Sequence, residues 1–374
     1  MVAIIQKRSI RDFDWILALL AVGLVCFGAT QIRSALPGET YWVKQLIGLG
    51  IALVAMVAVA LTDYRKLLNL APAFYIFGII LLIIVLIPGI GLKINGQRAW
   101  IKLPGGIGQF QPSEFVKVTT AMMLARYFGR NRVGPLAVKE MLVGGLILAI
   151  PCALILLEPD VGSVITYLPI LGVVLFLSAI KMRIVIAALI LGLVTLPFAY
   201  WVGVKTNLVK GYQQERINVI LDPEKADRRG FGYNTWQSIL TVGEGGLFGA
   251  QLSTEFSQST LKFLPEAHTD FIFSVAAGNT GFIGCILVLL AYAVLLARLI
   301  TGARRAPDRP GMLVIMAIVG GLTFQIFINI GMALGILPVI GVPLPLLSAG
   351  LASLIATFIA IGFAISVQLR RFVN

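Results

Sequence analysis

The sequence predicts an all-α polytopic membrane protein with about ten transmembrane helices and a large extracytoplasmic loop. Of its 374 residues, 58% are hydrophobic and only 13% are charged, and the mean hydropathy is +0.94. Soluble domains are less apolar and carry about 25% charged residues. The apolar residues also gather in runs of spanning length, since a helix needs about 20 residues to cross a bilayer.

Ten apolar runs follow one another along the chain and are interpreted as the spans. They lie near residues 14–32, 43–61, 69–87, 112–128, 141–157, 161–179, 183–202, 269–298, 311–335 and 347–368. The first run is longer than the core of a signal peptide, so we interpret it as a retained span. The polar, glycine-rich segment 203–268, between the seventh and eighth runs, predicts the large loop. We expect a single membrane domain over residues 1–374, because no internal repeat is visible.

The basic residues of the short loops indicate the orientation, because cytoplasmic loops carry an excess of Lys and Arg. With the N-terminus inside, most loop cations fall on the cytoplasmic side, as Arg65, Arg126 and Arg370 do. Few of them, such as Arg33 and Lys44, then fall outside. We therefore expect both termini in the cytoplasm.

Cysteine and histidine usage disfavours two other kinds of site. The three cysteines, Cys26, Cys152 and Cys285, lie inside apolar runs, and an odd number of buried thiols argues against a disulfide framework. With His268 as the only histidine, a histidine-based zinc site is disfavoured as well. We predict no metal site from motifs, and we expect no nucleic acid partner.

Residues 263–273, FLPEAHTDFIF, bring Glu266, His268 and Asp270 together just before a long apolar run. A carboxylate at the edge of a membrane helix is unfavourable unless it has a partner or a function. Asp270 is therefore the first candidate for a functional carboxylate. The alternative is a helix cap, in which Thr269 or Asp270 accepts backbone N–H groups.

The outside loop 95–112 contains a cluster of two cations and an aromatic residue, Arg98, Trp100 and Lys102. Cations held outside, against the general trend, suit an anionic head group. The alternative is interfacial anchoring, since Trp and Arg favour the head-group level of a bilayer in any case.

One pair of opposite charges, one acidic pair and one glycine cluster leave alternatives open. Glu114 and Lys117 are three residues apart, so we expect them to pair on one helix face, either as structural support or as a cavity lining. Glu158 and Asp160, between the fifth and sixth runs, could place a cation or a sugar hydroxyl, or Asp160 could cap the next helix. Residues 243–249, GEGGLFG, fit a flexible turn better than a phosphate-binding loop.

Five blocks of the sequence resemble one known family. They read QPSEFVK, DPEKADRRGFGY, GEGGLFG, FLPEAHTDFIF and INIGMALGILPVIGVPLPLLS. The similarity covers nearly the whole chain, and the HTDF and GVPLPL blocks are highly specific in this spacing. The chain is similar to the SEDS polymerases of bacterial peptidoglycan synthesis, and it most resembles the elongation-specific members.

The resemblance implies a multi-pass glycosyltransferase of the bacterial inner membrane that polymerises lipid II on the outer side. Its partners would be lipid II, undecaprenyl-pyrophosphate-linked glycan, membrane lipid and the elongation complex, with a class B penicillin-binding protein as transpeptidase. The family's essential aspartate corresponds to Asp270, which we expect to act as general base. Four further family positions correspond to Trp100, Glu114, Lys117 and Asp160.

A pyrophosphate leaving group needs positive charge near it as the bond breaks. The candidates for this role are Arg98, Lys102, Arg216 and Lys262, although Arg216 could instead pair with its neighbour Glu215. We expect Glu266 to hold a sugar hydroxyl or to cap a turn, and His268 to lie at the substrate. A divalent cation, Mg or Mn, could bridge pyrophosphate and carboxylates, but the sequence contains no dedicated metal motif.

The chain departs from the family pattern at three places. Gly278 and Asn279 stand where the family has two glutamates, residues 348–352 read SAGLA instead of SYGGS, and Lys262 stands where division-specific relatives often have glutamate. The lost charges leave a second function open, that of a non-catalytic scaffold for the penicillin-binding protein. A third is a lipid II flippase, which predicts charges distributed through the spans, whereas here they gather outside and at helix mouths.

Overall fold

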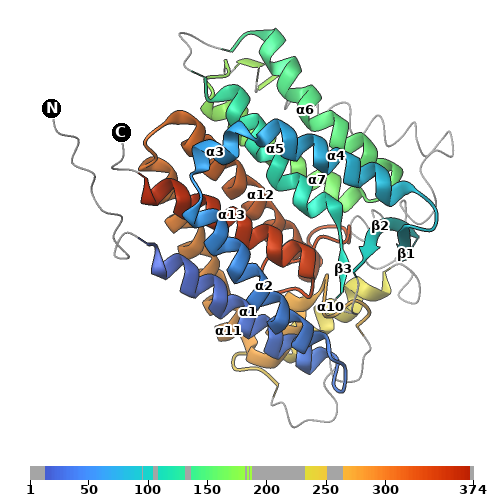
Figure 1. Cartoon of the computed structure of the whole chain (residues 1–374). Helices are drawn as coiled ribbons and strands as arrows, with labels where there is room; N and C mark the ends of the chain where they lie inside the picture. Colours follow the sequence, from blue (N-terminus) through green and yellow to red (C-terminus); the bar gives the residue numbers. More distant parts are fainter. Residues whose placement is uncertain are drawn as a thin grey trace.

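The protein is a bundle of helices with a small sheet at one end, as the computed structural model of the chain shows (Figure 1). The structure describes residues 13–94, 96–103, 108–130, 136–181, 183–184, 186–187, 232–250 and 264–370. Its helices are α1 (Trp15–Ala35), α2 (Tyr41–Leu61), α3 (Tyr64–Asn69), α4 (Ala71–Leu86), α5 (Pro112–Phe128), α6 (Val138–Leu157), α7 (Val161–Leu177), α10 (Tyr233–Glu244), α11 (Ile272–Arg304), α12 (Arg309–Ala333) and α13 (Leu351–Leu369). Its strands are β1 (Gly91–Ile94), β2 (Gln97–Lys102) and β3 (Gln109–Phe110).

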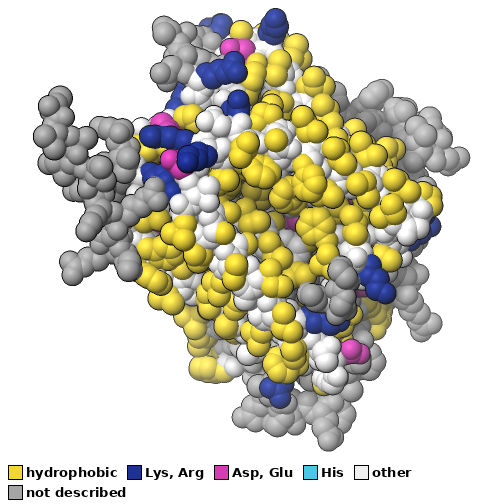
Figure 2. Space-filling model, in the orientation of Figure 1, with side chains coloured by type: hydrophobic (Ala, Val, Ile, Leu, Met, Phe, Trp, Pro, Cys, Tyr) yellow, Lys and Arg dark blue, Asp and Glu magenta, His cyan; other side chains and the backbone are white. Residues whose placement is uncertain are grey.

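The surface and the helix lengths confirm the class of a helical, polytopic membrane protein. In the described part of the chain, α1, α2, α6, α11, α12 and α13 are long and apolar enough to cross a membrane. Helices α4 and α7 are apolar but shorter. Figure 2 shows a broad band of hydrophobic side chains with Lys and Arg gathered on either side of it. Most of the predicted span 183–202 and most of the predicted loop 203–268 lie outside the described residues.

Aspartates cap four of the described helices, α3 through Asp63 and three of the apolar ones. Asp14, Asp160 and Asp308 are the N-caps of α1, α7 and α12, and each carboxylate accepts the backbone N–H of the residue three positions further on. Such a cap supplies a partner for an N–H group that has none within the first turn. These short polar residues therefore determine where three of the apolar segments begin.

Helices α1 and α11 lie together and are joined by polar contacts at both ends of an apolar stretch. Arg298 of α11 pairs with Asp14 at 2.8 Å. Towards the other end, Asn279 Nδ2 of α11 donates to Gln31 Oε1 at 2.8 Å and to Ser34 Oγ at 2.9 Å. Between these contacts a groove of about 810 Å³ opens on the surface, and its lining includes Leu19, Phe27, Phe248 and Leu287.

The small sheet is a feature that the sequence prediction of an all-α fold did not contain. Strand β2 pairs antiparallel with β1 and with β3, in the order β1-β2-β3. The turn between β1 and β2 contains Gly96, at a φ of 85°, in an Asn-Gly dipeptide, which is a strong hairpin signal. Alternate residues of a strand face the same side, so Trp100 and Lys102 share one face of β2. A register shift in the pairing with β1 places Trp100 opposite Leu92 and Arg98 opposite Lys93, so Arg98 does not share that face.

Helix α11 is broken at Gly281, which has φ 66° and ψ −167°, and residues 245–249 fill the break. The N–H groups of Phe282 and Ile283 donate to carbonyls of this segment at 2.9 and 3.1 Å. A Cβ atom on Gly249 would lie 2.2 Å from a carbonyl oxygen of α11. The segment is a turn, as expected, and its glycines allow two backbones to pack directly against each other.

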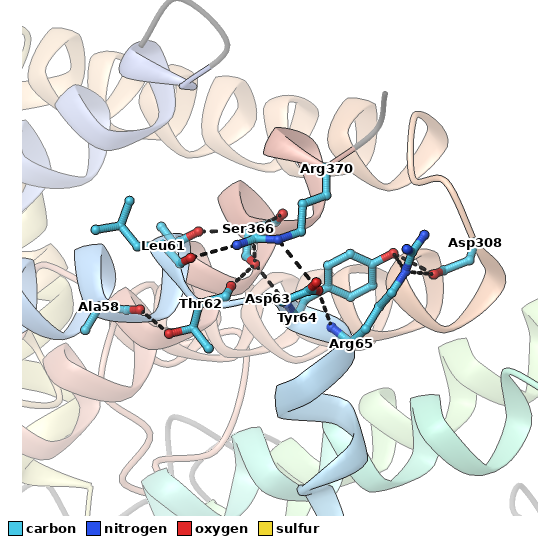
Figure 3. A network of polar contacts seen from close by, with 10 residues as sticks. Ala58, Leu61, Thr62, Asp63, Tyr64, Arg65, Asp308, Ser366 and Arg370 are labelled. Carbon is cyan, nitrogen blue, oxygen red and sulfur yellow. Dashed lines mark hydrogen bonds and ion pairs between the residues drawn. The ribbon is translucent and has the colours of Figure 1, made fainter. Parts of the chain in front are cut away.

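A polar network joins α2, α3, α12 and α13 at the end of the bundle opposite the sheet (Figures 1 and 3). Arg370 is only 3% exposed, and its guanidinium donates to the carbonyls of Leu61 and Ser366 at 2.7 and 2.8 Å. Tyr64 donates to Asp308 Oδ2 at 2.6 Å. The network thus gives partners to carbonyls at the end of α2, which have none within the helix.

We expect Arg370→Ala to lower the free energy of unfolding by about 2–4 kcal/mol, because it removes a buried charged donor from several carbonyls. Thermal unfolding of the purified protein in detergent measures the change. Arg304→Ala is the control, since Arg304 is exposed at the end of α11 and such surface changes stay within about 0.5 kcal/mol. Equal losses in the two variants would contradict this role of Arg370.

We also expect Gly281→Ala to destabilise the protein and Gly145→Ala to leave its stability unchanged or raise it. A Cβ atom at position 281 would lie 2.3 Å from the backbone nitrogen of Gly249, at a positive φ, whereas one at position 145 in α6 meets no atom within 4 Å. Alanine in the left-handed region costs about 1–2 kcal/mol, and alanine inside a helix is favoured over glycine. A Tm for Gly281→Ala at or above that of the parent would exclude a packed break in α11.

Candidate functional site

Residues 264–270 form a tight turn that leads into α11. The Glu266 carbonyl accepts the N–H groups of Thr269 and Asp270 at 3.1 and 3.0 Å, and Glu266 has a positive φ of 52°. The N-cap of α11 is Phe271, with no side-chain cap. The alternative in which Thr269 or Asp270 takes the N-cap position is therefore wrong, and the role of Asp270 has to be judged from its surroundings.

His268 lies half-buried in this turn, with its ring 4.8 Å from the ring of Tyr41 at the start of α2. Burial lowers the pKa of His268, while the carboxylates of Glu266 and Glu39 act in the opposite direction. The imidazole is therefore mainly neutral at pH 7. A neutral imidazole can donate and accept hydrogen bonds. The substrate contact expected for His268 would therefore be a hydrogen bond and not an ion pair.

The non-helical segment 334–350, between α12 and α13, lies between Asp270 and the start of α7. A Cβ atom on Gly341, where φ is 73°, would lie 3.5 Å from Asp270 Oδ2. On the other side, a Cβ atom on Gly162 of α7 would lie 2.2 Å from the carbonyl oxygen of Ile340. Glycine at these two positions lets the segment pack closely against both the carboxylate and α7.

Glu114 and Lys117 on α5 form the expected ion pair. Lys117 Nζ lies 2.8 Å from Glu114 Oε1, and the two side chains are 6% and 10% exposed. The pair also lines a cavity of about 40 Å³ together with Gln325 and Thr357, and Gln325 Nε2 is buried without a hydrogen-bond partner. Both roles that the sequence left open, support and cavity lining, therefore apply.

Asp160 caps α7, as one of the two alternatives predicted. Its carboxylate accepts the N–H and the hydroxyl of Ser163 at 2.9 and 2.6 Å and Gln111 Nε2 at 3.1 Å. Glu158, two residues earlier, is fully buried, and neither of its carboxylate oxygens has a hydrogen-bond partner. Burial, reinforced by the charge of Asp160, raises the pKa of Glu158 to about 8.

The cluster on β2 is partly anchored in the fold. Arg98 Nη1 donates to the carbonyl of Leu86, at the end of α4, at 3.2 Å, so this side chain is held by the fold. Trp100 is half-buried and Lys102 is exposed. Gln97 Nε2 donates to the carbonyl of Pro159 at 3.2 Å, so the sheet rests on the turn that carries Asp160.

The candidate residues therefore fall into connected groups at one end of the bundle. The turn 264–270 holds three of them, and β2 holds three more. Burial raises the pKa of Asp160, the charge of Glu114 raises it further, and the charge of Lys117 lowers it. Arg216 and Lys262 lie outside the described residues. Among the residues that are described, no group of three or more His, Cys, Asp or Glu side chains could hold a metal ion.

Sequence reasoning missed two polar residues that contact the turn. Asn329 Nδ2 of α12 donates to the carbonyl of Asp270 at 2.8 Å, and Ser348 Oγ donates to the carbonyl of Thr269 at 2.5 Å. Both lie in the block INIGMALGILPVIGVPLPLLS. The available signal was an amide in the middle of an apolar span, because polar residues inside a membrane usually have a function.

The fold and this site define a class of protein, a helical membrane protein with a polar site built around an aspartate at one end of its bundle. The family described as "Cell cycle protein", which groups FtsW, RodA and SpoVE, matches residues 11–371. The chain belongs to this family.

Curated relatives match over almost their full length. The peptidoglycan glycosyltransferase MrdB of Escherichia coli K12 is 35% identical over 370 residues, which cover 98% of this chain and 97% of the relative. The stage V sporulation protein E of Bacillus subtilis is 33% identical over 371 residues, which cover 95% and 96%.

Solved structures agree with these relatives. One chain of a peptidoglycan synthase complex superposes with a TM-score of 0.82 at 31% identity, covering 97% of this chain and 99% of its own length. RodA of Thermus thermophilus superposes with a TM-score of 0.71 at 30% identity, covering 97% and 98%. The expected SEDS family, with RodA among its nearest members, is confirmed, and so is the expected enzyme class, a peptidoglycan glycosyltransferase.

The buried Glu158 gives a prediction for the pH dependence of stability. Its pKa in the folded protein, about 8, lies above the ordinary value of 4.5, so the folded state binds the extra proton between these two values. Stability should therefore fall as pH rises from about 4.5 to 8. Glu158→Gln should remove this fall, with Tm values close to the parent at pH 5 and about 3–6 °C higher at pH 8.5.

Glu39→Gln is the matched control for that measurement. Glu39 is an exposed carboxylate, so its replacement should leave the fall of Tm with pH unchanged. Parallel pH curves for Glu158→Gln and the parent would show that Glu158 is not the group responsible.

Proposed function

We propose that this chain polymerises lipid II into glycan strands during cell elongation, with Asp270 as the general base. The observation that carries this proposal is the position of the Asp270 carboxylate. It lies half-buried in a turn at the mouth of α11, against a glycine of the segment 334–350. A carboxylate at a membrane edge can reach a lipid-linked sugar whose polyprenyl tail stays in the bilayer.

The proposed reaction forms one bond and breaks one. Asp270 takes the proton of the acceptor sugar hydroxyl, the hydroxyl oxygen attacks the anomeric carbon of the donor sugar, and the bond from that carbon to the pyrophosphate oxygen breaks. The proton then passes from Asp270 to solvent. A general base of this kind contributes about 10²- to 10⁴-fold in rate.

The remaining polar groups have proposed roles in the same step. Arg98 and Lys102 both lie on β2 and would stabilise the pyrophosphate as negative charge builds up on it. Arg216 and Lys262 are further proposed cations. Trp100, Glu266 and His268 would contact the sugar or the head group, while Glu114, Lys117 and Asp160 would shape the floor of the site.

The finer membrane arrangement belongs to the same proposal. It comprises a single domain over residues 1–374 with ten spans, the large loop 203–268 outside, and both termini in the cytoplasm of a bacterium with the active site facing outwards. It also includes a class B penicillin-binding protein as partner. The partner is supported by the relative that forms part of a peptidoglycan synthase complex. The placement of both termini on one side is supported by Figure 1, where the start of α1 and the end of α13 lie at the same end of the bundle.

Transport of lipid II has less support than polymerisation. The buried ion pair of Glu114 and Lys117 lines a cavity of about 40 Å³, which is room for only about two or three water molecules. A disaccharide head group with its pyrophosphate is many times larger. We therefore assign these charges to the support of the site.

We expect Asp270→Asn to abolish polymerisation of labelled lipid II by the purified protein with its penicillin-binding partner. Asparagine keeps the shape of the side chain but cannot accept a proton at neutral pH, so the Tm and the co-purification of the partner should stay unchanged. Asp63→Asn, in the network at the opposite end of the bundle, is the control and should stay active. Glycan strands from the Asp270→Asn protein at the parental rate would falsify the assignment, and lipid inversion without strands would favour transport.

A further inference from the structure

The backbone of the turn that carries Asp270 is held from outside at three consecutive residues. The carbonyl oxygens of His268, Thr269 and Asp270 each accept a hydrogen bond from another part of the chain. The donors, in that order, are the N–H of Ala349, the Oγ of Ser348 and the Nδ2 of Asn329, at 2.9, 2.5 and 2.8 Å.

The two side-chain donors act in a dry environment. Asn329 is 0% exposed and Ser348 is 6% exposed. A buried hydrogen bond is stronger than one in water, because no solvent competes for the donor or the acceptor. Loss of either donor would leave a carbonyl of the turn without this partner, and water could reach it only by opening the packing around α12 and the segment 334–350.

Both donors are themselves held in place by further hydrogen bonds. Asn329 Nδ2 also donates to the carbonyl of Val342 at 2.8 Å, and Ser348 Oγ also accepts the N–H of Leu344 at 2.8 Å. These contacts fix the orientation of the amide, since the reversed orientation would place its oxygen against two carbonyl oxygens. The donors therefore have little freedom to follow a displaced turn.

We propose that Asn329 and Ser348 are positioning residues that set the place of the Asp270 carboxylate relative to the acceptor hydroxyl. The inference rests on the proposed function of Asp270 as the base. Misplacement of a reacting group by about 1 Å can cost about 100-fold in rate. A turn fixed at the backbone of Asp270 and of its two predecessors meets this demand without any contact between the donors and the substrate.

The test compares two serines with similar backbone contacts. Ser348 and Ser366 are both buried, each accepts one backbone N–H, and each donates to one backbone carbonyl. Ser366 Oγ also accepts a hydrogen bond from Arg370 Nη1 at 2.7 Å, so its replacement tests general destabilisation at least as severely. Ser366 lies in the network at the opposite end of the bundle (Figure 3). With the full-length protein, its penicillin-binding partner and labelled lipid II, Ser348→Ala should lower kcat about 10- to 100-fold with KM within about twofold. Ser366→Ala should lower Tm by a similar amount and keep kcat within about twofold.

A second variant tests the hydrogen-bond donor itself. Asn329→Asp has nearly the same shape, but its carboxylate donates a hydrogen only when it is protonated. The ratio of its kcat to that of the parent should therefore rise as pH falls from 8 to 5.5, measured well below the Tm of both proteins. A ratio that stays well below one and does not change with pH would assign Asn329 a purely structural role and overturn the inference for that residue.

The outcomes separate this inference from the proposed function. If Asp270→Asn is inactive while Ser348→Ala keeps the parental kcat, the positioning role is wrong and the base assignment stands. Equal losses of kcat in Ser348→Ala and Ser366→Ala would also overturn the positioning role, because they would reflect general destabilisation. If Asp270→Asn polymerises lipid II, the proposed function is wrong, whatever the serine variants do.

Discussion

The site depends on one constraint, which is that backbone polar groups surrounded by apolar material need hydrogen-bond partners inside the protein. Helices meet this need by themselves, but the turn 264–270 and the segment 334–350 are not helical. They meet it with each other, through Ala349, and with the buried side chains of Asn329 and Ser348. Irregular backbone can therefore exist at the mouth of the bundle, and here it carries the carboxylate of Asp270.

Local patterns in the sequence predicted what local physics determines. The spacing of Glu114 and Lys117 predicts a pair on one helix face, and Asp160 just before an apolar run offers a cap as one of two alternatives. Both are present. Most of the described helices also overlap the apolar runs expected for them, because the hydrophobic thickness of a bilayer sets their approximate length.

Contacts between distant parts of the chain could not be predicted in this way. The bonds from Asn329 and Ser348 to the turn join residues 59 and 79 positions apart, and no periodicity reports such a pairing. The packing of residues 245–249 into the break at Gly281 could not be predicted for the same reason. Glycine clusters have several uses, and only the partner backbone distinguishes a packed contact from a flexible turn.

The departures from the family pattern are built into the packing of this chain. Asn279 binds Gln31 and Ser34 of α1 through neutral hydrogen bonds. A Cβ atom on Gly278 would lie 3.1 Å from Thr241 of α10, so the missing side chain allows close contact there. The altered segment 348–352 retains the serine that binds the turn. At positions 278 and 279, where the resemblance implies charge, this chain therefore has close packing and neutral hydrogen bonds.

The groove between α1 and α11 gives the surrounding lipid a part in the packing of the protein. Its two ends are closed by polar contacts, while its apolar walls face outwards over about 810 Å³. Walls without neighbouring atoms lose dispersion contacts, so in a bilayer hydrocarbon chains complete this face. Lipid chains are in this sense part of the packing of the protein, and a detergent with short tails would fill the groove less completely.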